Sequence, residues 1–129
     1  MELWSRSNEY LKRLSQKWIV IIPTDVIQTD DSIIITSDIS GLKRGEIQVT
    51  ATKSSILIQG VRDCEERRTP QSRMNRAGRV CGELDEEISF MPKVDPSTIQ
   101  ATYVDGILRV DLKKASTTET PGEPTSVNL

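Results

Sequence analysis

Cysteine and histidine are the residues whose numbers most limit the chemistry open to this chain. Its 129 residues include two cysteines, Cys64 and Cys81, and no histidine. Without histidine, Ser-His-Asp catalysis, Cys-His catalysis and the usual zinc sites are excluded. No glycine-rich phosphate loop follows a strand pattern, and no pair of carboxylates stands in an interpretable frame. The sequence therefore predicts no enzyme activity and no catalytic, metal-binding or cofactor-binding residues.

The two cysteines are compatible with free thiols or with a structural bridge. The first residues, Met1 to Arg6, lack the apolar core and the small-residue cleavage site of a signal peptide. A cytoplasmic location is therefore expected, and stable disulfides are rare in that compartment. We accordingly expect Cys64 and Cys81 to be reduced thiols.

Arginine is concentrated in the segment between Gly60 and Gly82. The arginines of this segment are interspersed with Asp63, Glu65 and Glu66, and few apolar residues intervene. A loop of this length is uncommon unless it is functional or disordered. The whole chain nevertheless has a net charge of −2, so its overall field favours neither nucleic acid nor a membrane surface.

The elements that must position this loop are short strands separated by turn residues. Seven strands are expected, at residues 25–28, 32–39, 47–52, 55–59, 81–90, 99–103 and 107–113. No credible helix lies among them. The pattern predicts an all-β fold, an antiparallel β-sandwich of immunoglobulin-like appearance over residues 23–114.

The clearest turn lies between the last two of these strands. Asp105-Gly106 separates two alternating segments, and both residue types tolerate the positive φ that a two-residue hairpin requires. The alternation after the turn predicts that Leu108, Val110 and Leu112 share one face of the strand, with Arg109, Asp111 and Lys113 on the other.

The N-terminal arm, residues 1–22, has the pattern of an amphipathic helix. Its apolar residues fall within an arc of roughly 120° on a helical wheel. Docking on the chain's own core, self-association with binding of unfolded chains, and membrane-surface binding are three alternatives, and we favour the second because a sandwich closes without an extra helix. The residues of this arc are Leu3, Trp4, Tyr10, Leu11, Leu14 and Trp18.

The C-terminal tail, residues 115–129, begins as a Thr-, Pro- and Gly-rich segment of the kind that forms flexible linkers. It ends with Val127-Asn128-Leu129. In an extended peptide, Val127 and Leu129 project from one face, so they can enter adjacent pockets while the backbone adds to a sheet edge.

Three sequence motifs follow one another along the chain. Asp38–Leu42 is similar to D-L-P-G-F, with Ser40 in place of the proline. Residues 88–96 are similar to I-x-L-P-x-x-V-D-P, although Met91 replaces the proline and Glu86 precedes the motif where arginine is usual. Residues 101–108 are similar to A-x-x-x-[N/D]-G-[V/I]-L. In this order, the three motifs resemble those of the small heat-shock protein, or α-crystallin, family.

The resemblance implies an ATP-independent holdase that assembles from homodimers into larger homo-oligomers and binds partly unfolded client proteins. It implies that the loop at about 61–80 carries a strand that pairs with a partner subunit's sheet, the loop residues being Arg67, Arg68, Arg73, Met74 and Arg76. It also implies that Val127 and Leu129 dock in a neighbour's groove, lined by Ile47, Val49, Ala51, Ile99, Ala101 and Tyr103.

Two alternatives remain open at this point. A CS-domain co-chaperone or adaptor has a similar sandwich but lacks the long arginine-rich loop and the terminal V-x-L. A peripheral membrane protein anchored by the Trp4/Trp18 helix is the other, and the small local excess of basic residues ranks it last.

Overall fold

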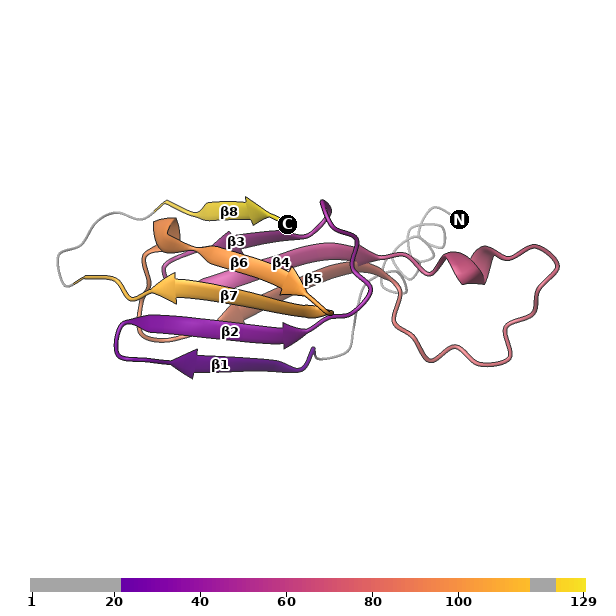
Figure 1. Ribbon diagram of the computed structural model, residues 1–129, viewed down its shortest axis with the longest axis horizontal. Coiled ribbons are helices and arrows are strands. Elements are labelled where there is room, and N and C mark those ends of the chain that lie inside the picture. The colour runs from indigo at the N-terminus through magenta and orange to yellow at the C-terminus, as the bar shows by residue number, and fades with distance from the viewer. Residues whose placement is uncertain (1–21, 117–122) are drawn as a thin grey trace, which may run out of the picture.

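The chain folds into two four-stranded antiparallel sheets that pack face to face (Figure 1). The computed structural model describes residues 22–116 and 123–129. One sheet has the order β1 (Thr24–Gln28), β2 (Ser32–Asp38), β7 (Ile107–Lys113), β6 (Gln100–Val104). The other has the order β5 (Gly82–Ser89), β4 (Ser55–Arg62), β3 (Gln48–Ala51), β8 (Thr125–Asn128). The predicted all-β sandwich is confirmed.

The core lies between the sheets and follows from the two-residue period of the strands. In β2 and β7 every second residue is buried, because one face of each strand meets the opposite sheet. Ile33, Ile35, Leu108, Val110 and Leu112 are at most 1% exposed. The opposite sheet adds another row of fully buried residues, Val49, Ala51, Ile56 and Ile58.

The β6–β7 turn has the predicted conformation. Asp105 and Gly106 have φ angles of 53° and 78°, the left-handed region that a tight hairpin of this kind uses. The Gly106 carbonyl accepts a hydrogen bond from the Ile39 amide at 2.8 Å. The turn is thereby tied to the segment that leaves β2.

The N-terminal helix that the sequence predicts lies outside the described residues, with its apolar residues Leu3, Trp4, Tyr10, Leu11, Leu14 and Trp18. Within the described part of the chain, no helix has the length and apolar character needed to span a membrane.

The C-terminal tail is not a linker throughout. Its last residues form β8, which pairs antiparallel with β3 and gives the second sheet a fourth strand. The β3 edge explains this difference, because its unpaired amides and carbonyls gain hydrogen-bond partners when an extended peptide lies beside them.

Candidate functional site

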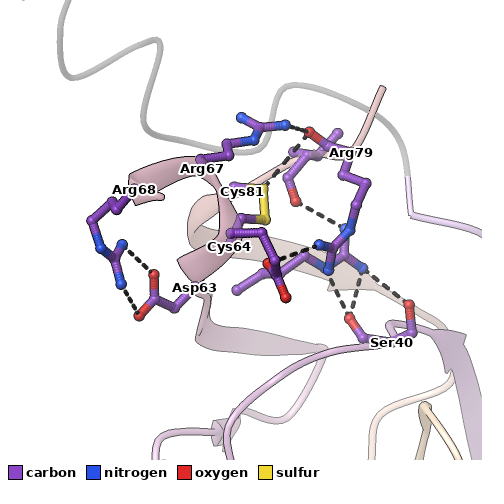
Figure 2. The surroundings of a disulfide bond; sticks show 10 residues. Ser40, Asp63, Cys64, Arg67, Arg68, Arg79 and Cys81 are labelled. Carbon is purple, nitrogen blue, oxygen red and sulfur yellow. Dashed lines mark hydrogen bonds and ion pairs between the residues drawn. A yellow bond between two sulfur atoms is a disulfide. The ribbon is translucent and has the colours of Figure 1, made fainter. Parts of the chain in front are cut away.

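The arginine-rich loop, residues 63–81, projects beyond the end of the sandwich from between β4 and β5 (Figure 1). A disulfide between Cys64 and Cys81 closes its base, with the two Cα atoms 5.9 Å apart (Figure 2). The expectation of two reduced thiols is therefore wrong. That expectation followed from the cytoplasmic location expected for the chain. In the structure β4 and β5 pair as far as Arg62 and Gly82, and this pairing brings the two cysteines together.

Arg62 joins the loop base to the sandwich. Its guanidinium donates to the Ser40 carbonyl from Nε at 2.9 Å and from Nη2 at 2.7 Å, and to the Val80 carbonyl from Nη1 at 2.9 Å. Partial burial, followed by the nearby charge of Arg79, lowers the pKa of Arg62 from its usual value. The side chain thus links the segment after β2 to the limb of the loop that returns to β5.

Two further contacts order the loop near its base. The short 3-10 helix Glu65–Arg68 follows Cys64, and Arg67 Nη2 donates to the Arg79 carbonyl at 2.6 Å across the loop. Arg68 binds Asp63 through two hydrogen bonds of 2.7 and 3.1 Å. The hydrogen bond from Arg68 holds the pKa of the Asp63 carboxyl below its usual value.

The outer part of the loop surrounds an open hollow of about 670 Å³. Four of the five expected dimer-loop residues line this hollow, Arg67, Arg73, Met74 and Arg76. The fifth, Arg68, binds Asp63 instead. Met74 is 52% exposed. Residues 63–81 contain the short helix and no strand in the single chain that the structure describes.

The tail lies in a groove between the two sheets at their β3 and β6 edges. Val127 stands opposite Val49 in the β3–β8 ladder, and directly opposed residues of an antiparallel pair share a face, so both side chains point toward the core. The Leu129 amide donates to the Ile47 carbonyl at 2.8 Å, and the Leu129 carbonyl accepts from the Gly45 amide.

The remaining groove residues divide into those beside the tail and those behind it. Leu129 lines a hollow of about 350 Å³ together with Ala101 and Tyr103. Ala51 stands opposite Thr125 in the ladder, and Ile99 packs against the buried core. In this single chain the groove is thus filled by the chain's own tail.

Tyr103 closes one end of this groove. Its hydroxyl donates to the Ile39 carbonyl at 2.7 Å and accepts from the Leu42 amide at 3.1 Å. Arg44 adds a hydrogen bond from Nη2 to the Tyr103 carbonyl at 3.0 Å and lines the Leu129 hollow. These bonds join β6 to the connection between β2 and β3, which thereby supports the groove wall.

Arg44 was not predicted as part of either site, and Arg62 was predicted only as one of the arginines between Gly60 and Gly82. The partners of both side chains are backbone carbonyls far along the chain. No spacing rule identifies such pairs. Within residues 22–116 and 123–129 no group of three His, Cys, Asp or Glu side chains has the arrangement of a metal site.

Comparisons with known proteins agree with this architecture. Residues 25–128 match the Hsp20/alpha crystallin family. The 18 kDa heat shock protein of Clostridium acetobutylicum is 29% identical over 91 residues, which are 70% of this chain and 60% of that protein. The small heat shock protein hspL of Dictyostelium discoideum is 28% identical over 100 residues, 78% of this chain and 72% of that protein. This chain therefore matches less than two thirds of the Clostridium protein's length.

Solved structures show the same fold. Heat shock protein 16.0 from Schizosaccharomyces pombe superposes with a TM-score of 0.66 at 22% identity, over 81% of this chain and 96% of that one. The hspA protein from Xanthomonas axonopodis gives a TM-score of 0.64 at 22% identity, over 75% and 96% of the two chains. Because the family match covers most of the chain, the protein belongs to the Hsp20/alpha crystallin family. This is a family of small heat shock chaperones that is not known for enzyme activity.

Proposed function

We propose that this protein is an ATP-independent holdase that assembles from dimers and binds partly unfolded proteins. The observation that carries the proposal is the V-x-L tail in the groove between β3 and β6, joined to a sandwich of the small heat shock type. Such a protein needs no catalytic residue. Its exposed apolar side chains bind the apolar surface of an unfolding client, and the bound client aggregates more slowly.

The dimer contact that we propose joins the arginine-rich loop to the β1 edge of a second copy. Among the residues that the structure describes, β1 pairs only with β2, and its other side offers backbone groups to an added strand. Val26 and Ile27 on β1 are 44% and 50% exposed. Arg73 and Arg76, which have no ion-pair partner among the described residues, would meet acidic side chains there, those of Asp25 and Asp30.

Larger assemblies would form when tails exchange between copies. The groove that holds Val127 and Leu129 within one chain accepts the same residues from a neighbour, with the same β3 ladder. Burial of two such side chains gives about 3–5 kcal/mol before the cost of ordering the tail is subtracted. Each link is therefore weak, and many links together hold a particle that still exchanges subunits.

Client binding is assigned mainly to the N-terminal arm. Its apolar residues, Leu3, Trp4, Tyr10, Leu11, Leu14 and Trp18, are not required to close the sandwich. Deletion of residues 2–18 should reduce client protection while the far-UV circular dichroism of the β-domain persists. Loss of that β signal would instead make the arm part of the core.

Aggregation of an unrelated protein tests the proposal directly. The full chain at a near-equimolar ratio should suppress heat-induced light scattering of a client such as citrate synthase, with no ATP present. Folded protein that gives no suppression at several-fold excess would overturn the holdase function. A folded globular protein of similar size, without client activity, serves as the control.

A further inference from the structure

The Cys64–Cys81 bridge lies beside an open hollow with an unusual electrostatic setting. The hollow has a volume of about 310 Å³ and is lined by both cysteines together with Arg62, Arg67 and Arg68. Arg68 is paired with Asp63, which also lines the hollow. Arg62 and Arg67 donate to neutral backbone carbonyl groups, and the three arginines and one aspartate that line the hollow together carry a net positive charge. The bridge is thus approached through a region of net positive charge.

We propose that Cys64–Cys81 is a thiol–disulfide exchange site that is opened by small anionic thiols of the glutathione type. Cys64 is only 5% exposed, whereas Cys81 is half-buried, so Cys81 Sγ is the sulfur open to attack. Exchange proceeds through the thiolate form of the attacking thiol, and two guanidinium groups raise the local concentration of an anion.

The exchange takes place in two steps and reduces the bridge to two thiols. A thiolate forms a bond to Cys81 Sγ, the Sγ–Sγ bond breaks, and its electron pair leaves on Cys64 Sγ, which takes up a proton. A second thiolate attacks the sulfur of the first thiol in the mixed disulfide, and Cys81 leaves as a thiolate that is also protonated. The protein gains two electrons and two protons, and two thiols become one small disulfide.

Opening the bridge removes the covalent link between the two limbs of the loop. The cross-loop contacts are the Arg67 bond to the Arg79 carbonyl, the Arg62 bond to the Val80 carbonyl, and a 3.6 Å ion pair between Arg79 and Glu66. The ion pair is strongly exposed and restrains the limbs little. With the bridge open, the limbs separate and the loop samples many more conformations.

This larger freedom would weaken the dimer, a consequence that rests on the proposed function. A loop that is already fixed at its base loses less conformational entropy when it binds a second copy. The oxidised protein should therefore dimerise more tightly than the reduced protein. The bridge then adjusts how readily the loop leaves its partner.

The first test measures exchange alone. Full-length protein is treated at low salt with glutathione, which is anionic, or with cysteamine, which is cationic, and free thiols are counted by alkylation and mass spectrometry. Each rate is divided by the rate for the same protein unfolded in urea. Glutathione should then react about tenfold faster than cysteamine, and the difference should shrink in about 0.5 M salt and in Arg67→Gln. Equal normalised rates, or free thiols in the air-oxidised protein, would overturn the proposal.

The second test measures the loop and the dimer in the two redox states. Amide hydrogen exchange of residues 63–81 should be several-fold faster in the reduced protein and in Cys64→Ser/Cys81→Ser, which should no longer respond to thiols. If amide hydrogen exchange in the loop is unchanged, the bridge does not restrain the loop and the proposal is wrong. Sedimentation should show a weaker dimer on reduction. A protein that exchanges thiols as expected but protects no client would refute the proposed function and leave the exchange site standing.

Discussion

Two connections at one end of the sandwich differ in length and in their contacts with the core. Both join antiparallel neighbours, β6 to β7 through Asp105-Gly106 and β4 to β5 through residues 63–81. Both also contact the segment around Ser40. A Cβ atom on Gly106 would lie 3.2 Å from Ser40 Cα, and Arg62 at the base of the long loop donates to the Ser40 carbonyl.

The difference lies in what each connection does for the fold. The short turn is fixed by the conformation of its own two residues and by contact with the body of the protein. Among residues 63–81 only Cys64 is buried, and the rest of the loop contributes no side chain to the core. A segment that the core does not need can carry a charged binding surface without loss of the fold.

The comparison predicts its largest effect at Gly106. In Gly106→Val, a β-branched residue would occupy φ 78° with its Cβ 3.2 Å from Ser40 backbone. Strain and close contact together should cost about 3 kcal/mol of unfolding free energy, which lowers the melting temperature by roughly 10–20 °C. Differential scanning calorimetry measures the shift.

Gly78→Val is the matched control on the long loop. No atom lies within 4 Å of the position that its Cβ would take, so the melting temperature should stay within about 2 °C of the wild type. Equal losses in the two variants would show that the loop is as much a part of the folded core as the turn.

A second prediction converts the long connection into a short one. Residues 63–81 are replaced by Asn-Gly, which joins the register partners Arg62 and Gly82. The melting temperature should stay within roughly 5 °C of that of the reduced wild type, because a shorter loop offsets the lost contacts at the base. Dimer affinity measured by sedimentation should fall about 100-fold or more. A variant that stays dimeric would place the dimer contact on another surface.

These two regions also explain how much the sequence could predict. The turn and the alternation of Leu108, Val110 and Leu112 in β7 depend on neighbours along the chain, and both were predicted correctly. The bridge and the Arg62 bonds depend on pairs far apart in the sequence. Cysteine spacing alone cannot show that β4 and β5 pair as far as Arg62 and Gly82, although that pairing is what brings Cys64 and Cys81 together.

The tail shows the same division between what neighbouring residues determine and what distant residues determine. The period of two placed Val127 and Leu129 on one face, and they are on one face in the structure. The local pattern does not predict which groove the tail occupies, since the β3 edge of this chain and that of a neighbour are chemically identical.

We expect the tail, like the long loop, to be needed for assembly and not for the stability of the sandwich. Val127→Ala/Leu129→Ala removes the apolar contacts of β8 but leaves its backbone ladder, so the melting temperature should fall by less than roughly 3 °C. Particles larger than the dimer should dissociate in sedimentation velocity. Asn128→Ala, on the exposed face, should change neither. If Val127→Ala/Leu129→Ala sediments like the wild type, assembly depends on the N-terminal arm and not on the tail.

The smallest effect is expected at the Asp63–Arg68 ion pair on the long loop. The pKa of Asp63 is lowered mainly by its hydrogen bond from Arg68, so the pair stabilises the folded protein above the unfolded-state pKa, which is about 4. That contribution is lost as the pH falls through the lower folded-state pKa. Both side chains are exposed, so Asp63→Asn should lower the melting temperature by less than about 1 °C at pH 7. The difference from wild type should shrink as the pH falls below about 4 and in high salt. A large loss at pH 7 would mean that the loop conformation, and not only its base, supports the sandwich, and the contrast between the two connections would fail.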